Sequence, residues 1–79
     1  MSQQGKLIAK FLNARTFKWS ELAKLLKGLA YSEVQGEGSR VKFVKGNKVI
    51  NLHRPHPSPE MKSYAIRQVR ESLQEWGEL

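Results

Sequence analysis

The stretch RVKFVKGNKVINLH, residues 40–53, decides the fold because it predicts two strands joined by a tight turn. Apolar and polar side chains alternate on each side of Gly46-Asn47, and these residue types are typical of a two-residue hairpin loop. The register set by this loop creates two apolar cross-strand pairs, Phe43 with Ile50 and Val41 with Leu52. A shift by one residue would bury lysines, so we predict a β-hairpin in this register.

Two helices are predicted before the hairpin. Residues 5–14 carry a narrow apolar stripe, so we expect a helix that docks on the domain without founding its core. The stripe consists of Leu7, Ile8, Phe11 and Leu12. Thr16 is placed to cap a second helix, in which leucines recur at helical spacing and which ends near Gly28.

A short strand is predicted before the hairpin and a helix after it. Residues 31–35 predict the strand, with Val34 as its apolar anchor, and residues 36–39 form a flexible turn. After the hairpin, Ser58 is placed to cap a helix that has Pro59 at its first position. This helix carries apolar residues at helical spacing, namely Ile66, Val69, Leu73 and Trp76.

The order of these elements is helix, helix, strand, strand, strand, helix, which predicts an α+β fold. A three-stranded antiparallel sheet needs one face covered, and the second and last helices can both cover that face. Seventy-nine residues suffice for one core, so we expect residues 1–79 to form a single domain, with residues 5–14 as an additional N-terminal helix.

Composition also indicates where the protein acts. The chain has no cysteine, which excludes disulfides and zinc–thiolate sites and fits a reducing compartment. Its apolar runs are too short to span a membrane, and residues 1–10 lack the pattern of a secretory signal. We therefore expect a soluble cytoplasmic protein.

The charge of the chain indicates a polyanionic partner. A formal net charge of +7 on 79 residues attracts polyanions, of which nucleic acids are the most abundant in the cytoplasm. No acidic residue lies between Gly38 and Pro59, where the basic residues are Arg40, Lys42, Lys45, Lys48 and Arg54. Charge alone also fits an acidic protein as the partner, so both partners stay open at this point.

The hairpin register places Arg40 opposite His53 on the polar face. A histidine titrates near neutral pH and can take a proton from a ribose 2′-hydroxyl group. An adjacent guanidinium can bind phosphate through two parallel hydrogen bonds and stabilise developing negative charge. Both residue types together suffice for RNA cleavage without a metal or other cofactor, although a lone histidine at a strand end is more often an ordinary polar residue.

Further candidates surround this pair. His56 lies between two prolines and fits an acid, a phosphate contact or a turn residue. With only Glu60 as a nearby third ligand, the two histidines predict no metal site. The predicted RNA-binding residues are Ser39, Lys42, Lys45, Lys48, Arg54 and Lys62. The hairpin lysines also fit the simpler task of keeping a strand edge soluble.

The aromatic residues divide into two groups. Trp19 and Trp76 lie on predicted helices with apolar neighbours, which favours packing over base stacking. Tyr64 fits either packing or contact with a partner.

Several of these segments together resemble the HicA family. They are Gly38-Ser39-Arg40, the hairpin and the run from Leu52 to Pro57, with further similarity at residues 17–22 and 60–62. The family comprises mRNA interferase toxins of bacterial toxin–antitoxin pairs. The resemblance implies a fold like the double-stranded RNA-binding domain, ribosome-independent cleavage of mRNA, and neutralisation by an antitoxin of the HicB family.

This chain departs from the family pattern at one position. Many members carry the catalytic histidine directly after the Gly-Ser pair, where this chain has Arg40. His56 matches the His-Pro that recurs before the last helix of the family, whereas His53 is an additional histidine. Our hypothesis is that His53 has taken over the acid–base role across the strand from Arg40.

Three functions are therefore compatible with the sequence. The first is a ribonuclease toxin held inactive by an antitoxin. The second is a non-catalytic RNA-binding module that uses the same basic face. The third is a protein-interaction domain that docks on an acidic, antitoxin-like partner.

Overall fold

The predicted hairpin forms in the register expected from its sequence. The computed structural model describes residues 3–55 and 58–79, and in it β3 (Arg40–Lys45) pairs antiparallel with β4 (Lys48–His53). All the predicted cross-strand pairs are present, from Lys45 with Lys48 at the tip to Arg40 with His53 at the open end. Gly46 has φ +60, as the first residue of a type II′ turn requires, so glycine suits this place.

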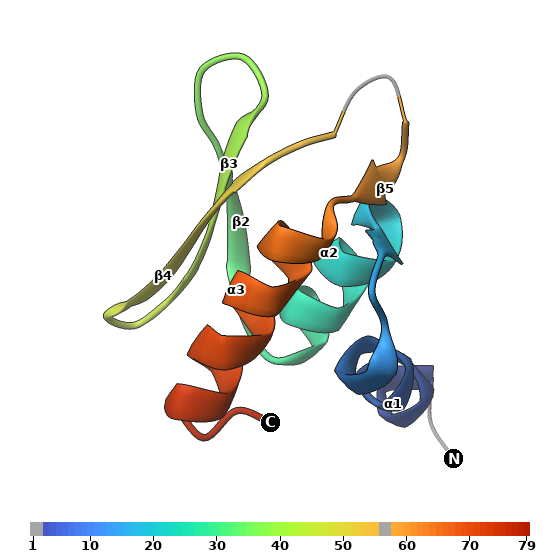
Figure 1. Ribbon diagram of the computed structural model, residues 1–79. Coiled ribbons are helices and arrows are strands. Elements are labelled where there is room, and N and C mark those ends of the chain that lie inside the picture. Colours follow the sequence, from blue (N-terminus) through green and yellow to red (C-terminus); the bar gives the residue numbers. More distant parts are fainter. Residues whose placement is uncertain (1–2, 56–57) are drawn as a thin grey trace.

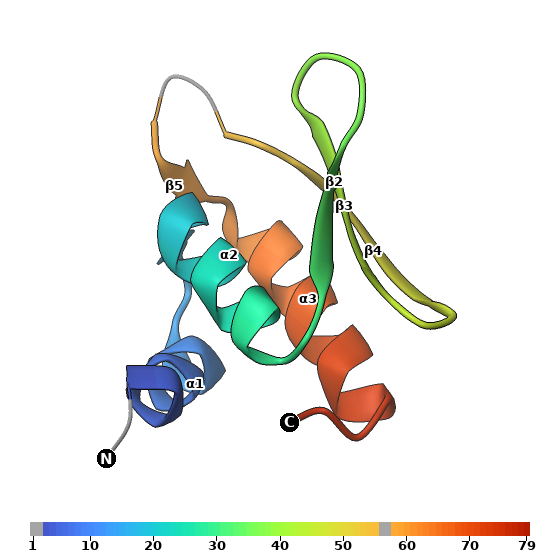
Figure 2. The same ribbon diagram turned by 180° about the vertical axis from the view of Figure 1, so that it is seen from behind.

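A third strand completes the main sheet. β2 (Ser32–Gln35) pairs antiparallel with β3, so the strand order is β2-β3-β4 and β4 is an edge strand. Figures 1 and 2 show α2 (Trp19–Gly28) and α3 (Ser63–Glu75) on the same side of this sheet. The other face of the sheet is left open, as expected for an α+β fold whose antiparallel sheet has one polar face.

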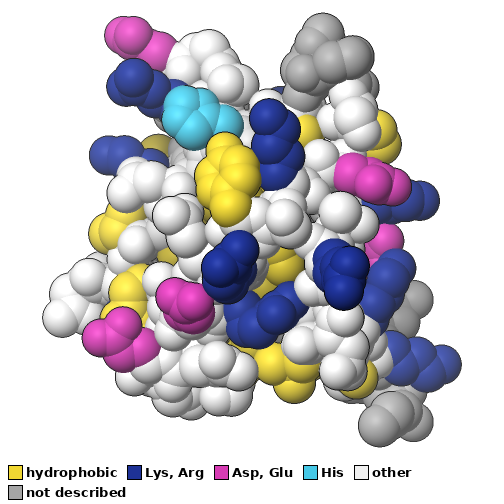
Figure 3. Space-filling model, in the orientation of Figure 1, with side chains coloured by type: hydrophobic (Ala, Val, Ile, Leu, Met, Phe, Trp, Pro, Cys, Tyr) yellow, Lys and Arg dark blue, Asp and Glu magenta, His cyan; other side chains and the backbone are white. Residues whose placement is uncertain are grey.

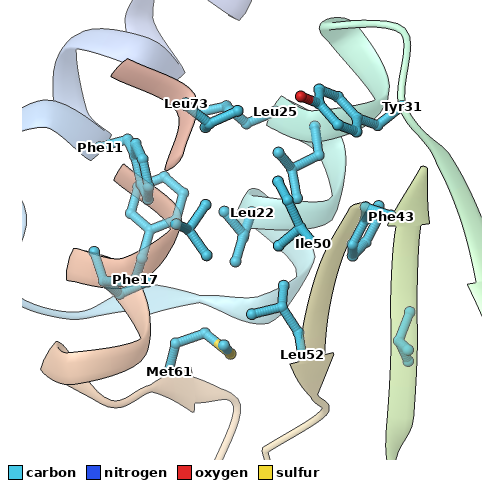
Figure 4. Close-up of a cluster of buried hydrophobic side chains, with 14 residues drawn as sticks. Phe11, Phe17, Leu22, Leu25, Tyr31, Phe43, Ile50, Leu52, Met61 and Leu73 are labelled. Carbon is cyan, nitrogen blue, oxygen red and sulfur yellow. The ribbon is translucent and has the colours of Figure 1, made fainter. Parts of the chain in front are cut away.

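The core lies between the sheet and these two helices (Figure 4). The sheet contributes the four predicted residues of its apolar face, Val41, Phe43, Ile50 and Leu52. The helices contribute Leu22, Leu25, Leu26, Ile66, Val69 and Leu73, each with at most 2% of its surface exposed. Burial of a side chain of this size contributes about 1.5–3 kcal/mol, so the alternating and helical patterns together determine the layers.

The N-terminal helix packs on the rest of the domain. α1 spans Gln3–Asn13, and its Phe11 is fully buried in the shared core, with its ring 5.3 Å from that of Phe17. The guanidinium of Arg70 on α3 donates to the carbonyl oxygens of Phe11 and Ala14 at the end of α1. Leu12, expected on the buried stripe, is 38% exposed. The helix therefore docks on the domain mainly through Phe11, which joins the shared core, while Leu7 and Ile8 pack against it partly buried.

A small second sheet was not expected. β1 (Phe17–Lys18) pairs antiparallel with β5 (Glu60–Met61), and the pairing places the buried side chains of Phe17 and Met61 opposite each other. These four residues are too few to show an alternating pattern in the sequence. The pair ties the start of α2 to the start of α3.

This second sheet overturns both predicted helix caps. α2 begins at Trp19 with Lys18 at the N-cap position, so Thr16 does not cap it. α3 begins at Ser63 and not at Pro59, because residues 60–61 are held in the strand pair. The Ser58 hydroxyl instead accepts the backbone N–H of Glu60 at 3.3 Å.

The predicted anchor of β2 is also wrong. Val34 lies opposite Lys42 on the open face and is 46% exposed. Tyr31, directly before the strand, is 3% exposed and joins the core instead. The strand is short, and its single apolar residue therefore gave too little pattern to identify its buried face.

None of the helices in the described part of the chain is long and apolar enough to cross a membrane.

Candidate nucleic-acid interface

Arg40 and His53 lie side by side at the open end of the hairpin. The backbone N–H of Arg54 donates to the Ser39 carbonyl oxygen at 2.7 Å, which extends the ladder by one residue. The neighbouring pair, Arg40 and His53, is therefore a non-hydrogen-bonded pair, in which opposite side chains stand closest. Both residues are exposed. The prediction that the guanidinium and the imidazole share one solvent-facing side of the sheet is confirmed.

Ser39 adjoins the imidazole of His53. Gly38 has φ +61, a conformation that side chains disfavour, and the turn that it allows brings Ser39 back beside β4. Ser39 Oγ is 3.5 Å from His53 Nδ1, at the outer limit of a hydrogen bond. When Nδ1–H is the donor in this contact, Nε2 carries the free lone pair and can accept a proton.

Two hollows meet at His53. One, of about 470 Å³, lies on the open face and is lined by Arg40, Lys42, Asn51 and His53, with residues 36–37 at its end. The other, of about 500 Å³, lies between β4 and the start of α3, and its polar lining includes His53, Arg54, Lys62 and Tyr64. Figure 3 shows the histidine on the surface, among Lys and Arg side chains and next to a hydrophobic one. Its imidazole can thus be reached from either hollow.

Three cations near this point are available for phosphate. Arg40 and Lys42 stand on the open face, and Lys62 lines the second hollow. Within the described part of the chain, none of the three has a carboxylate at ion-pair distance. An uncompensated exposed cation suits phosphate binding, since no internal ion pair has to break first.

Lys45 and Lys48 are not brought to this site. The pleat of the strands turns them to the helix-covered side, where both bind the carboxylate of Glu78, at 2.9 and 2.8 Å respectively. Hydrogen bonds from Lys48 and Lys45 hold the pKa of Glu78 below its ordinary value. These two lysines, grouped with Lys42 in the predicted RNA-binding set, are committed to an internal contact.

Arg54 both contacts neighbouring side chains and lines one of the two hollows. Its guanidinium carbon lies 5.7 Å from the centre of the Trp19 ring, and its Nη2 is 3.5 Å from Glu33 Oε2. It also lines the second hollow. Trp19 itself packs against Phe43 with the ring centres 5.9 Å apart, which confirms its predicted packing role. Arg54 is thus oriented by its neighbours and still borders the site.

Sequence reasoning missed two carboxylates that decide which cations are free. Glu33 binds Lys27 and Arg54, and Glu78 binds Lys45 and Lys48. Glu33 lies opposite Phe43, on the covered face of β2, where a charge needs a partner. The place of Glu33 on the covered face was the one signal in the sequence that it needs a cationic partner. His56, a predicted catalytic residue, lies outside the described residues.

A comparison with protein families identifies the chain. The model of a family described as the HicA toxin of bacterial toxin–antitoxin systems matches residues 19–75, well over half of the chain. The chain belongs to the HicA toxin family. The matched range includes Arg40, His53 and both hollows of this HicA chain, whereas α1 and Glu78 lie outside it.

No curated protein and no solved structure matched this HicA chain. The predicted likeness of its fold to the double-stranded RNA-binding domain therefore stays a prediction. A toxin of this family implies a cognate antitoxin as its partner.

Proposed function

We propose that this toxin is an endoribonuclease that cleaves mRNA without a metal, with His53 as its acid–base residue. Toxins of the HicA family are generally mRNA interferases. The observation that carries the proposal is the exposed pair of Arg40 and His53, opposite each other on one face of the sheet. When a 2′-hydroxyl attacks a phosphate, an adjacent imidazole can take its proton and an adjacent guanidinium can stabilise the charge on the phosphate.

The reaction follows from the positions of these groups. His53 Nε2 takes the proton of a ribose 2′-hydroxyl, and the 2′-oxygen then attacks the adjacent phosphorus atom. The bond from phosphorus to the 5′-oxygen breaks, which leaves a 2′,3′-cyclic phosphate and, after protonation, a 5′-hydroxyl. Arg40 stabilises the negative charge that develops on the phosphate oxygens. The sequence alone makes His56 a candidate for the acid that protonates the leaving 5′-oxygen.

Ser39 and the free cations have supporting roles in this proposal. In this mechanism Nδ1 carries the proton and points it at Ser39 Oγ, 3.5 Å away, which leaves Nε2 free as the base. Lys42 and Lys62 bind phosphates on either side of the cut, because they lie in the two hollows that meet at His53. The toxin acts in the cytoplasm, and its antitoxin belongs to the HicB family.

The test is cleavage of a single-stranded RNA by the purified chain in the presence of a chelator. We expect cleavage to persist in the chelator and to stop when the nucleotide at the cut carries a 2′-deoxyribose. Cleavage that needs added metal, or that survives the deoxy substitution, contradicts the mechanism.

Arg40, in the place of the usual family histidine, gives specific support to a second function, a binding-only relative. Such a protein would bind RNA with a steep dependence on salt and leave it intact. If the chain shows no salt-dependent binding of RNA, the protein-interaction function is correct instead. Induced expression in cells, scored for growth arrest and loss of mRNA, distinguishes a nuclease toxin from an RNA-binding module and from a protein-interaction domain.

A further inference from the structure

We propose that the hollow between β4 and α3 holds an unpaired base of the RNA, stacked on Tyr64, so that the toxin acts on single-stranded and not on duplex RNA. This inference rests on the RNA-cleaving function proposed above and names its substrate class. The hollow measures about 500 Å³, within the range of about 300–1,000 Å³ typical of small-ligand sites. It begins at His53, where the phosphate would react.

Among the described residues, Tyr64 is the one aromatic residue whose side chain is exposed. The other aromatic residues are buried or half-buried, whereas 59% of Tyr64 is exposed, in the first turn of α3. Its ring has no aromatic or cationic partner within the described residues. An apolar ring that faces water at the edge of a hollow is a stacking platform for a base, since every base offers a π face.

Uncharged polar groups line the same hollow as this ring. Gln68 lies four residues after Tyr64, on the same side of α3, and Asn51 of β4 also contributes to the lining of the hollow. Both amides offer a donor and an acceptor, which suits the edge of an unpaired base. Ser58 adds a hydroxyl on the same lining.

The lining of the hollow also carries charged groups. Glu60 is its carboxylate, while Lys62 and Arg54 are its cations, which can bind the phosphates that flank the base. His53 forms the wall shared with the hollow of Arg40 and Lys42. A strand that crosses the edge of β4 can thus leave a phosphate at Arg40 and His53 and place the adjacent base on Tyr64.

A duplex does not meet these requirements. Its bases are stacked and paired, and removing one from the stack has an unfavourable free energy that an already unpaired base avoids. Because a base of a duplex must first leave its stack to reach Tyr64, we expect the toxin to select unpaired RNA.

The experiment measures binding of an uncleavable 2′-O-methyl oligoribonucleotide by fluorescence anisotropy, as a single strand and as a duplex. We compare the wild type with Tyr64→Ala, Tyr64→Phe and Leu12→Ala, where Leu12 is an exposed apolar residue of α1. We expect Tyr64→Ala to weaken single-strand binding about tenfold, as for the loss of one stacked base. Tyr64→Phe and Leu12→Ala should bind like the wild type, and duplex binding should be weaker and insensitive to Tyr64.

A fluorescent base provides a second measurement in the same experiment. 2-Aminopurine in the single strand should be quenched by the wild type and by Tyr64→Phe, and not by Tyr64→Ala. If Tyr64→Ala binds and quenches like the wild type while the wild type still cleaves RNA, the base site is wrong and the nuclease function stands. If the wild type binds no RNA at all, the nuclease function fails, and the base site with it.

Discussion

Single residues decide which positive charges of the toxin are free to bind a phosphate. Lys42 and Lys45 lie on the same strand, three residues apart, yet the pleat sends them to opposite faces. Lys42 stands beside the candidate catalytic pair, while Lys45 binds Glu78. A count of lysines along the hairpin therefore overstates the charge available for phosphate.

This difference predicts unequal effects of two matched substitutions. Lys42→Ala should weaken binding of single-stranded RNA by about two- to fivefold and lower the slope of log affinity against log salt by about 0.7, as for one lost phosphate contact. Lys45→Ala removes the same charge from the chain and should leave the slope unchanged. Titrations at several salt concentrations measure both, and equal slopes for the two variants would refute this division of the lysines.

The residues of the site show what sequence can and cannot predict. The pairing of Arg40 with His53 followed from local alternation and the hairpin tip, and the structure confirms it. The internal binding of Lys45 and Lys48 depends on Glu78, which is 33 and 30 residues away from them respectively and which a local pattern does not bring near. Their place on the covered face was nevertheless predictable, because Lys45 shares strand parity with Val41 and Phe43.

At the scale of elements, the hairpin and the helices could be predicted and the second sheet could not. Six-residue strands and helices of at least ten residues show their periods clearly. β1 and β5 have two residues each, and their pairing joins segments far apart in the chain. The same omission misplaced both helix starts, since the strand pair occupied residues that had been assigned to the first turns of the helices.

The N-terminal helix offers a direct test of its place in the core. Phe11→Ala should lower the free energy of unfolding by about 3–5 kcal/mol, because it empties a fully buried aromatic site. Leu12→Ala, one residue away and 38% exposed, should change it by less than about 0.5 kcal/mol. Chemical denaturation of both variants gives the comparison. Equal, small effects would mean that α1 is only loosely docked after all.

For the whole molecule, one carboxylate near the C-terminal end links the last helix to the hairpin tip. Glu78 binds Lys45 and Lys48 at the two sides of the turn. Burial raises the pKa of the nearby Tyr31, and the negative charge of Glu78 raises it further. α1 and Glu78 both lie outside the residues matched by the family. The residues outside the matched range therefore contribute Phe11 to the core and an ion-pair partner to the hairpin tip.

This contact predicts a dependence of stability on pH. The pKa of Glu78 is lower in the folded state than its ordinary value of 4.5, so its contribution is complete above that value. The contribution is lost as the pH falls from there through the lower folded pKa. Glu78→Gln should be less stable than the wild type at neutral pH and should lose less stability on acidification below 4.5.

Thermal unfolding between neutral and acidic pH measures this effect. Glu75→Gln is the matched control, because Glu75 is exposed and forms no ion pair within the described residues. If Glu78→Gln loses as much thermal stability at acidic pH as the wild type, the carboxylate does not stabilise the hairpin.

In the proposed mechanism, His53 is the group that takes the proton from the 2′-hydroxyl. The most direct measurement is the single-turnover rate of RNA cleavage by the wild type and by His53→Ala, with protein in excess and chelator present. We predict that His53→Ala lowers this rate by about 100-fold or more, while RNA affinity and circular dichroism stay unchanged. A His53→Ala protein that cleaves at the wild-type rate would contradict the account.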